Sequence, residues 1–157
     1  MPFAVHLLSL ITLFDAGTQK LLAPERVLAF LGVDSLEIFL VSKEGVIQLF
    51  LPYPPSAVKG TQRLAVGDGT SVQAQCFTGP RAPELVLPAG PRVPTTEPLK
   101  QEKALQGCIL VTGLRGRGEY RSHGGDSITI TIERLHFPTS GVLRSLPLKA
   151  QVWVYPP

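Results

Sequence analysis

The sequence contains no asparagine and only one methionine, whereas proline and glycine each occur 15 times. Few thermolabile side chains combined with many loop prolines are typical of proteins from thermophiles. Codon bias in a GC-rich genome would give the same composition. The absence of asparagine therefore favours a hot habitat and a GC-rich genome about equally.

Charged residues are also scarce. They make up 17% of the 157 positions, and hydrophobic residues make up 44%, whereas an average soluble domain is about one quarter charged. A chain this apolar is expected to cover part of its surface with a neighbour. The 15 basic and 12 acidic residues leave a net charge of +3, which is too small to predict nucleic-acid binding by itself.

The sequence has only two cysteines, Cys76 and Cys108, and their spacing matches no metal-binding or redox motif. Each lies beside a predicted strand, so a disulfide is one interpretation. Two independent buried thiols are the interpretation we favour, because free cysteine is among the most often buried residue types.

Catalytic motifs are absent as well. The sequence has no nucleophile elbow, no Walker loop and no dinucleotide fingerprint. Asp68 stands in a Gly-Asp-Gly sequence, but a single Asp-Gly is ordinary turn chemistry. His123 and His136 have no metal-ligand spacing to each other or to Asp126. We therefore expect no catalytic residue, no cofactor, no metal site and a protein that is not an enzyme.

The longest apolar run, residues 3–14, is too short to span a bilayer, and it lacks the basic start and cleavage site of a signal peptide. We expect no membrane span. The run is predicted to be a strand buried on both faces or an arm packed on another subunit, with His6 as a hydrogen-bonded core residue.

Stretches with the alternating apolar and polar residues of β-strands are, in contrast, abundant in the sequence. Ser127–Phe137 is the clearest case, because three isoleucines alternate with polar residues at the period of a half-buried strand. At Arg134 the apolar positions change parity, and Leu135 and Phe137 continue them. This change predicts either a β-bulge or a strand that leaves one core for another contact.

Two elements are predicted in the first third of the chain. Residues 22–32 predict a short helix, with Pro24 in its first turn and Gly32 at its C-terminal cap. Residues 36–41 and 46–51 predict a β-hairpin, and their nearly continuous apolar sequence predicts that both faces are covered.

Further strands are predicted toward the C-terminus. Residues 61–66 and 70–77 flank the turn Gly67-Asp68-Gly69 and predict a second hairpin. Single strands are predicted over 108–112 and over 142–155, the latter broken by a proline.

The segment 79–98 contains six prolines and is predicted to be an extended excursion from the domain. Residues 84–87 predict a short edge strand within it. One or two helical turns are predicted over 99–105.

Residues 113–125 form a glycine-rich basic loop and are the sharpest candidate for a binding site. Guanidinium forks, closely approaching backbone N–H groups and aromatic stacking suit phosphate or single-stranded nucleic acid. The alternatives are a solvated loop, or a loop whose arginines pair with carboxylates of another subunit. The candidate residues are Arg115, Arg117, Tyr120 and Arg121.

Four other side chains are candidates for subunit contacts. After the change of parity, Arg134 and His136 occupy the positions that continue the spacing of the three isoleucines. There they either contact a neighbouring subunit or face solvent. Trp153 and Tyr155, near the C-terminus, suit interface anchors or lids on the core.

Together these patterns predict an all-β, single-domain β-sandwich or barrel over residues 1–157, jelly-roll-like, with one or two short helices. In strand-rich layout and composition the whole chain resembles the small single jelly-roll capsid proteins of tailless icosahedral bacteriophages, including those of thermophilic hosts. The resemblance implies a dimer or larger capsomer unit in the virion, strands upright in the shell and no catalysis. It assigns no functional residue.

Several functions are compatible with this pattern. The first is a structural assembly subunit, most concretely a viral capsid protein whose partners are its own copies and other virion proteins. The second is a β-barrel binding module, whose location would be cytoplasmic, that uses the loop 113–125 for phosphate or nucleic acid. A phage tail, connector or decoration protein is a neighbour of the first. A small enzyme would need titratable groups that converge in one cleft.

Overall fold

The computed structural model describes residues 19–43, 45–87, 99–121 and 124–154. Strands dominate these residues and join in one curled sheet, with the α-helix α2 (Ala82–Val86) and a 3-10 turn at Arg117–Glu119. The all-β, single-domain prediction is confirmed. The strands are β1 (Gln19–Leu22), β2 (Arg26–Leu31), β3 (Ser35–Val41), β4 (Gly45–Pro52), β5 (Thr61–Gly67), β6 (Gln73–Thr78), β7 (Lys100–Lys103), β8 (Gln106–Thr112), β9 (Ser127–Phe137), β10 (Gly141–Ser145) and β11 (Leu148–Val154).

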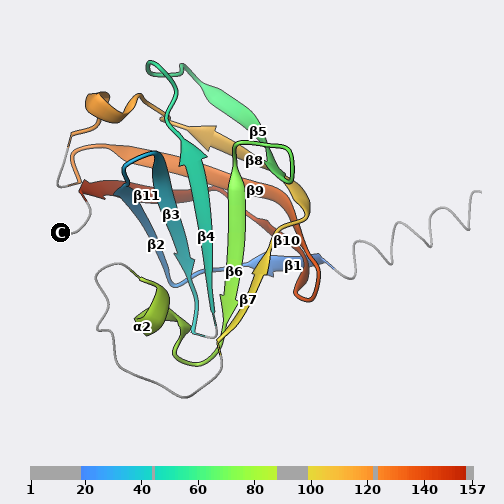
Figure 1. Cartoon of the computed structure of the whole chain (residues 1–157). Helices are drawn as coiled ribbons and strands as arrows, with labels where there is room; N and C mark the ends of the chain where they lie inside the picture. Colours follow the sequence, from blue (N-terminus) through green and yellow to red (C-terminus); the bar gives the residue numbers. More distant parts are fainter. Residues whose placement is uncertain (1–18, 44, 88–98, 122–123, 155–157) are drawn as a thin grey trace, which may run out of the picture.

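The sheet has two halves that cross each other and enclose the core as a half-barrel (Figure 1). One half is built from β2, β3, β4, β6 and β7, and the other from β5, β8, β9, β10 and β1. Strand β11 belongs to both, because residues 148–151 pair with β9 and residues 152–154 pair in parallel with β2. The curl therefore depends on a strand that passes from one half to the other.

The predicted strand Ser127–Phe137 is β9, the central strand of its half. It pairs with β8 on one side, and with β11 and then β10 on the other. In the pairing with β8, Ile132 and Arg134 face successive residues of β8, and Glu133 between them has no partner. Because one extra residue is present, Glu133 and Arg134 are both exposed, and Leu135 returns to the core. The predicted β-bulge is confirmed.

The half that contains β3 and β4 is covered on both faces. Its inner face packs against the crossing half, in the main hydrophobic core. Its outer face carries a second cluster beneath α2, formed by Phe30, Phe39, Val41, Val46 and Ala82. The predicted hairpin of β3 and β4 is confirmed, and so is the covering of both its faces.

The helix predicted over residues 22–32 is wrong. The segment holds the end of β1 and all of β2, which pairs along its length with β3. A short apolar run buried on two faces has no period that separates a strand from a helix, so sheet pairing decided the outcome.

Two other local predictions are also wrong. The edge strand expected at 84–87 is part of the helix α2, which begins with Pro83 in its first turn. The helical turn expected over 99–105 is the edge strand β7, which pairs with β6. Single-turn elements carry too little periodicity to be distinguished from sequence.

The second hairpin is wrong in its pairing, although its turn exists. Strand β5 pairs with β8, whereas β6 pairs with β4 and β7. The turn carries the chain from one half of the sheet to the other. The Thr70 hydroxyl closes it, because Oγ1 lies 2.8 Å from both the Gly67 and the Val72 carbonyl oxygens and its single proton is shared between them.

The two cysteines are both buried and unbonded, so the prediction of independent thiols is confirmed. The strand predicted over 142–155 is two strands, β10 and β11, separated by Leu146 and Pro147. Within the residues described, none of the helices has the length and hydropathy needed to cross a bilayer. The run 3–14 with His6, most of the proline-rich excursion, His123 and Tyr155 lie outside the described residues.

Candidate interaction surfaces and a cavity

Tyr120, predicted as a ligand or interface contact, faces the core instead. Its hydroxyl accepts a hydrogen bond from the Arg115 backbone N–H at 2.8 Å, and its ring packs near that of Tyr53, with centroids 6.4 Å apart. Burial raises the pKa of Tyr120, and burial raises the pKa of Tyr53 to about 12. Tyr120 thus anchors the loop 113–125 and is not available for stacking on a base.

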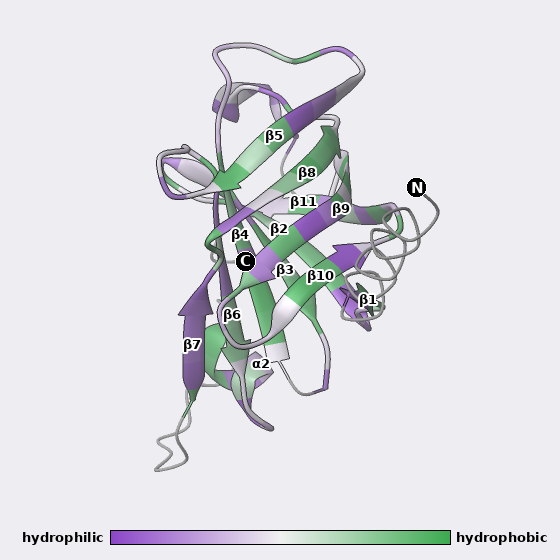
Figure 2. Ribbon diagram, turned by 90° about the vertical axis from the view of Figure 1, so that its right-hand side faces the viewer, coloured by the Kyte–Doolittle hydropathy of each residue, from purple (hydrophilic) through white to green (hydrophobic). Residues whose placement is uncertain are grey.

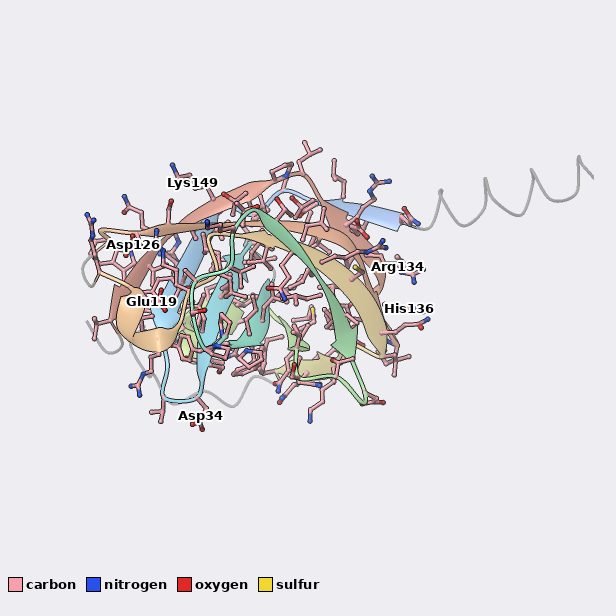
Figure 3. The ribbon with its side chains drawn as sticks, turned by 90° about the horizontal axis from the view of Figure 1, so that it is seen from above. Asp34, Glu119, Asp126, Arg134, His136 and Lys149 are labelled. Atoms are coloured by element: carbon pink, nitrogen blue, oxygen red, sulfur yellow. The ribbon has the colours of Figure 1, made fainter. Side chains whose placement is uncertain are left out.

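Some charged groups of the loop 113–125 already have partners nearby in the fold. Arg115 Nη2 lies 3.7 Å from Asp126 Oδ1, and the same carboxylate accepts a hydrogen bond from the Arg121 backbone N–H. Glu119 accepts one from the Ala57 backbone N–H at 3.2 Å. Figure 3 shows Glu119 and Asp126 on the same side of the molecule. Among the described residues, no carboxylate forms an ion pair with Arg117 or Arg121.

Arg134 and His136 lie on the outer face of β9, away from the loop (Figure 3). Next to them, Arg63 Nη2 lies 2.9 Å from Glu133 Oε2, and Arg63 Nε donates to Cys108 Sγ at 3.0 Å. The sequence did not single out Arg63, because it meets these partners only when β5 pairs with β8. This outer face is a polar, exposed surface.

Trp153 belongs to a group of exposed apolar side chains at the end of β11, which we call the C-terminal patch: Val33, Trp153 and Val154. They are 75%, 36% and 38% exposed. Because Trp153 and Val154 are successive residues of a strand, the patch lies on both faces of the strand end. Strand β11 pairs Val154 with Leu31, which places it near the turn that carries Val33. The Trp153 ring covers Gly124 so closely that a Cβ there would lie 2.9 Å from it.

A second exposed apolar surface lies beside β1 and β10. This N-terminal patch consists of Leu21 and Leu146, which are 55% and 66% exposed. The two patches together hold five of the six large apolar side chains exposed among the described residues, and Leu105 is the sixth. The N-terminal patch lies near the middle of β9, because Leu146 stands between Leu143, which pairs with Leu135, and Leu148, which pairs with Ile130. The C-terminal patch lies beyond the first residues of β9, where β11 continues past them to pair with β2 (Figure 1).

A cavity of about 550 Å³ opens where the two halves of the sheet diverge, between β1 and β10 on one side and the ends of β3, β4 and β6 on the other. Buried side chains form its floor: Leu40, Ile47, Cys76 and Leu143. Exposed residues surround its mouth: Lys20, Ala23, Glu25, Lys43, Thr78 and Ser140.

The thiol at the cavity floor is suited to packing and not to nucleophilic attack. Cys76 Sγ lies 3.8 Å from Thr78 Oγ1 and 3.9 Å from Ser140 Oγ. Burial raises the pKa of Cys76, and these hydroxyl contacts only partly oppose the effect. Because the thiolate is the reactive form, the thiol at this site is poorly activated at neutral pH.

Metal-ligating residues do not gather anywhere in the described part of the chain, where no group of three or more His, Cys, Asp or Glu could hold an ion. Comparison with known proteins gives no match: no protein-family model, no curated protein and no solved structure is similar to this chain.

Proposed function

We propose that the protein is a structural subunit that self-associates, most concretely a viral capsid or virion protein that builds a shell. The observation that carries the proposal is the pair of separate exposed apolar patches, one beside β1 and β10 and the other at the end of β11. Exposed apolar surface of this kind marks protein–protein contacts. Tryptophan in particular is enriched among the residues that dominate binding energy.

Two different patches favour a particular geometry of association. A contact between the N-terminal patch of one copy and the C-terminal patch of the next is heterologous. Contacts of this type repeat from copy to copy and generate rings or extended arrays. A shell or capsomer needs such repetition, which a single self-complementary patch does not supply.

One edge of the sheet is poorly suited to pairing with a strand of another copy, which favours association through side-chain surfaces. Strand β7, at one end of the strand order, has the sequence Lys-Gln-Glu-Lys and is hydrophilic along its length (Figure 2). Short, charged edge strands protect a sheet against pairing with another chain. Arg117 and Arg121, which form no ion pair among the described residues, are suited to carboxylates of a neighbouring copy.

Light scattering across concentration and salt tests the proposal. We expect a dimer or larger species that nuclease does not dissociate. The double variants Leu21→Lys/Leu146→Lys and Val33→Lys/Val154→Lys should each shift the mass toward monomer, because each buries charge in one contact. Leu105→Lys, at an exposed leucine outside both patches, is the matched control and should assemble normally.

Two outcomes would contradict this function. A monomeric protein at all concentrations would exclude self-association. Assembly that is lost with nuclease or rising salt would favour the loop 113–125 as a nucleic-acid site, because phosphate contacts release counterions.

A further inference from the structure

We propose that the cavity between the two halves of the sheet binds a medium-chain carboxylate, with the apolar chain on the floor and the carboxylate beside Lys20 and Lys43. This site is separate from the apolar patches, so it can fail or hold independently of the proposed assembly.

The size and floor of the cavity suit an apolar chain. A volume of about 550 Å³ lies within the range of small-molecule sites, roughly 300–1,000 Å³. The buried side chains of the floor come from four strands, β3, β4, β6 and β10, so the rigid sheet holds them in place. A preformed apolar floor binds hydrocarbon with little reorganisation.

The mouth of the cavity favours a negative head group. Lys20 is paired with Leu143, whose side chain is part of the floor, so Lys20 lies on the cavity side of β1. No salt bridge joins Lys20 or Lys43 to any described residue. Glu25 is the one acidic side chain among the lining residues. Glu102, close to the mouth, already accepts hydrogen bonds from the Thr139 and Ser140 backbone N–H groups. Lys20 and Lys43 therefore keep their charges available to a carboxylate of a ligand.

The position of Lys20 relative to the floor agrees with this arrangement. Burial raises the pKa of Cys76, and the negative charge of Glu102 adds to this effect, whereas the positive charge of Lys20 opposes it. The charge of Lys20 is therefore within reach of the floor. A ligand that carried only a negative charge would leave the floor uncovered, and a neutral hydrocarbon would leave the lysines without a partner. A carboxylate with a hydrocarbon chain satisfies both.

Cys76 provides a reporter inside the cavity. The variant Cys108→Ser leaves Cys76 as the only thiol. In this background we expect decanoate to slow the alkylation of Cys76 by N-ethylmaleimide, in a saturable way. Affinity should rise about fourfold for each methylene from hexanoate to decanoate, because each buried methylene contributes a constant free energy.

The lysines are tested by substitution. Lys20→Met/Lys43→Met should bind decanoate about tenfold more weakly and 1-decanol unchanged, because only the charged contact is lost. Lys149→Met, at an exposed lysine of β11 outside the cavity, is the matched control and should leave both affinities as they are.

Three outcomes would overturn the proposal. Decanoate that leaves the alkylation rate of Cys76 unchanged would show that the cavity does not bind it. Equal affinity for decanoate and 1-decanol would remove the role of the lysines. Protection of Cys76 without ligand that increases with protein concentration would assign the cavity to a segment of a neighbouring copy.

Discussion

The carboxylate of Glu102 accepts a hydrogen bond from the backbone N–H of Ser140 at 2.8 Å, and a second from that of Thr139 at 2.9 Å. The contact ties the edge strand β7, in one half of the sheet, to the turn between β9 and β10 in the other. Burial acts to raise the pKa of Glu102, but the hydrogen bonds from Ser140 and Thr139 outweigh it and lower the pKa.

Glu102→Gln is therefore expected to lower the free energy of unfolding by about 1 kcal/mol at neutral pH. This is less than the roughly 1.5–3 kcal/mol of buried hydrogen bonds to charged groups, because solvent reaches this side chain. A carboxylate with a depressed folded-state pKa stabilises the protein above its unfolded-state pKa, and the contribution is lost as pH falls through the folded-state value. Urea unfolding of both proteins should give curves that converge in strongly acidic buffer.

Glu84→Gln is the matched control for this experiment. Glu84 forms an ion pair near the surface with Arg81, the N-cap residue of α2, at 2.9 Å, and such pairs contribute little. If Glu84→Gln costs as much as Glu102→Gln, the link between β7 and the turn has no special role.

The bulge in β9 predicts an unusual tolerance to deletion. Removing Glu133 leaves Arg134 next to Ile132, which restores regular alternation and keeps Leu135 in the core. We expect this deletion to fold, with a loss of about 1–2 kcal/mol that includes the ion pair to Arg63. Thermal unfolding followed by circular dichroism measures the loss.

Deletion of Thr131 is the comparison, because it moves Ile132 to the solvent face and Glu133 toward the core. This variant should not fold cooperatively. If the two deletions are equally damaging, the unpaired Glu133 is not simply an extra residue in an otherwise regular strand.

The corner between β5 and β6 predicts a contrast between two glycines. Gly67 has φ = 117°, and a Cβ there would lie 2.4 Å from the Leu105 carbonyl oxygen. Gly60 has φ = 72° and open space around it. Gly67→Ala should therefore lose more than about 3 kcal/mol, and Gly60→Ala about 1–2 kcal/mol, as measured by urea unfolding. Equal losses of unfolding free energy would show that the backbone at Leu105 can shift at little cost to make room for the added Cβ.

Tyr53 and Tyr120 predict a loss of stability in alkali. Burial raises both pKa values, that of Tyr53 to about 12, so each hydroxyl keeps its proton longer in the folded protein than in the unfolded chain. Stability should fall as pH rises above the unfolded-state pKa near 10 and continue to fall toward the folded-state value. Ultraviolet titration of phenolate should show late ionisation of both tyrosines, and Tyr53→Phe should remove one of the two late phenolates.

The sequence predicted features that depend on neighbouring residues. The bulge at Glu133 follows from a change of parity within one strand, and the covered hairpin of β3 and β4 follows from two apolar runs around a turn. Strand β2 was mistaken for a helix because its identity depends on β3 and β11, which only the folded sheet brings beside it.

In the candidate sites, too, features set by neighbouring residues could be predicted and features set by distant residues could not. The loop 113–125 was found from its arginines and glycines, but the inward position of Tyr120 depends on its packing near Tyr53. The cavity could not be predicted, since its lining residues come from segments between residues 20 and 143 that meet only after the sheet has curled.

The two parallel strand pairs have a consequence for how the chain folds. Gln19 pairs with Val142, and Ala29 pairs with Val152, so β1 and β2 find partners more than 120 residues later in the sequence. On the ribosome, β1 lacks a partner until β10 has emerged, and β2 lacks one of its two. Pairings this distant in sequence slow folding. We therefore expect the half-barrel to close only after β10 and β11 have emerged, in one step that needs both these strands and β1 and β2.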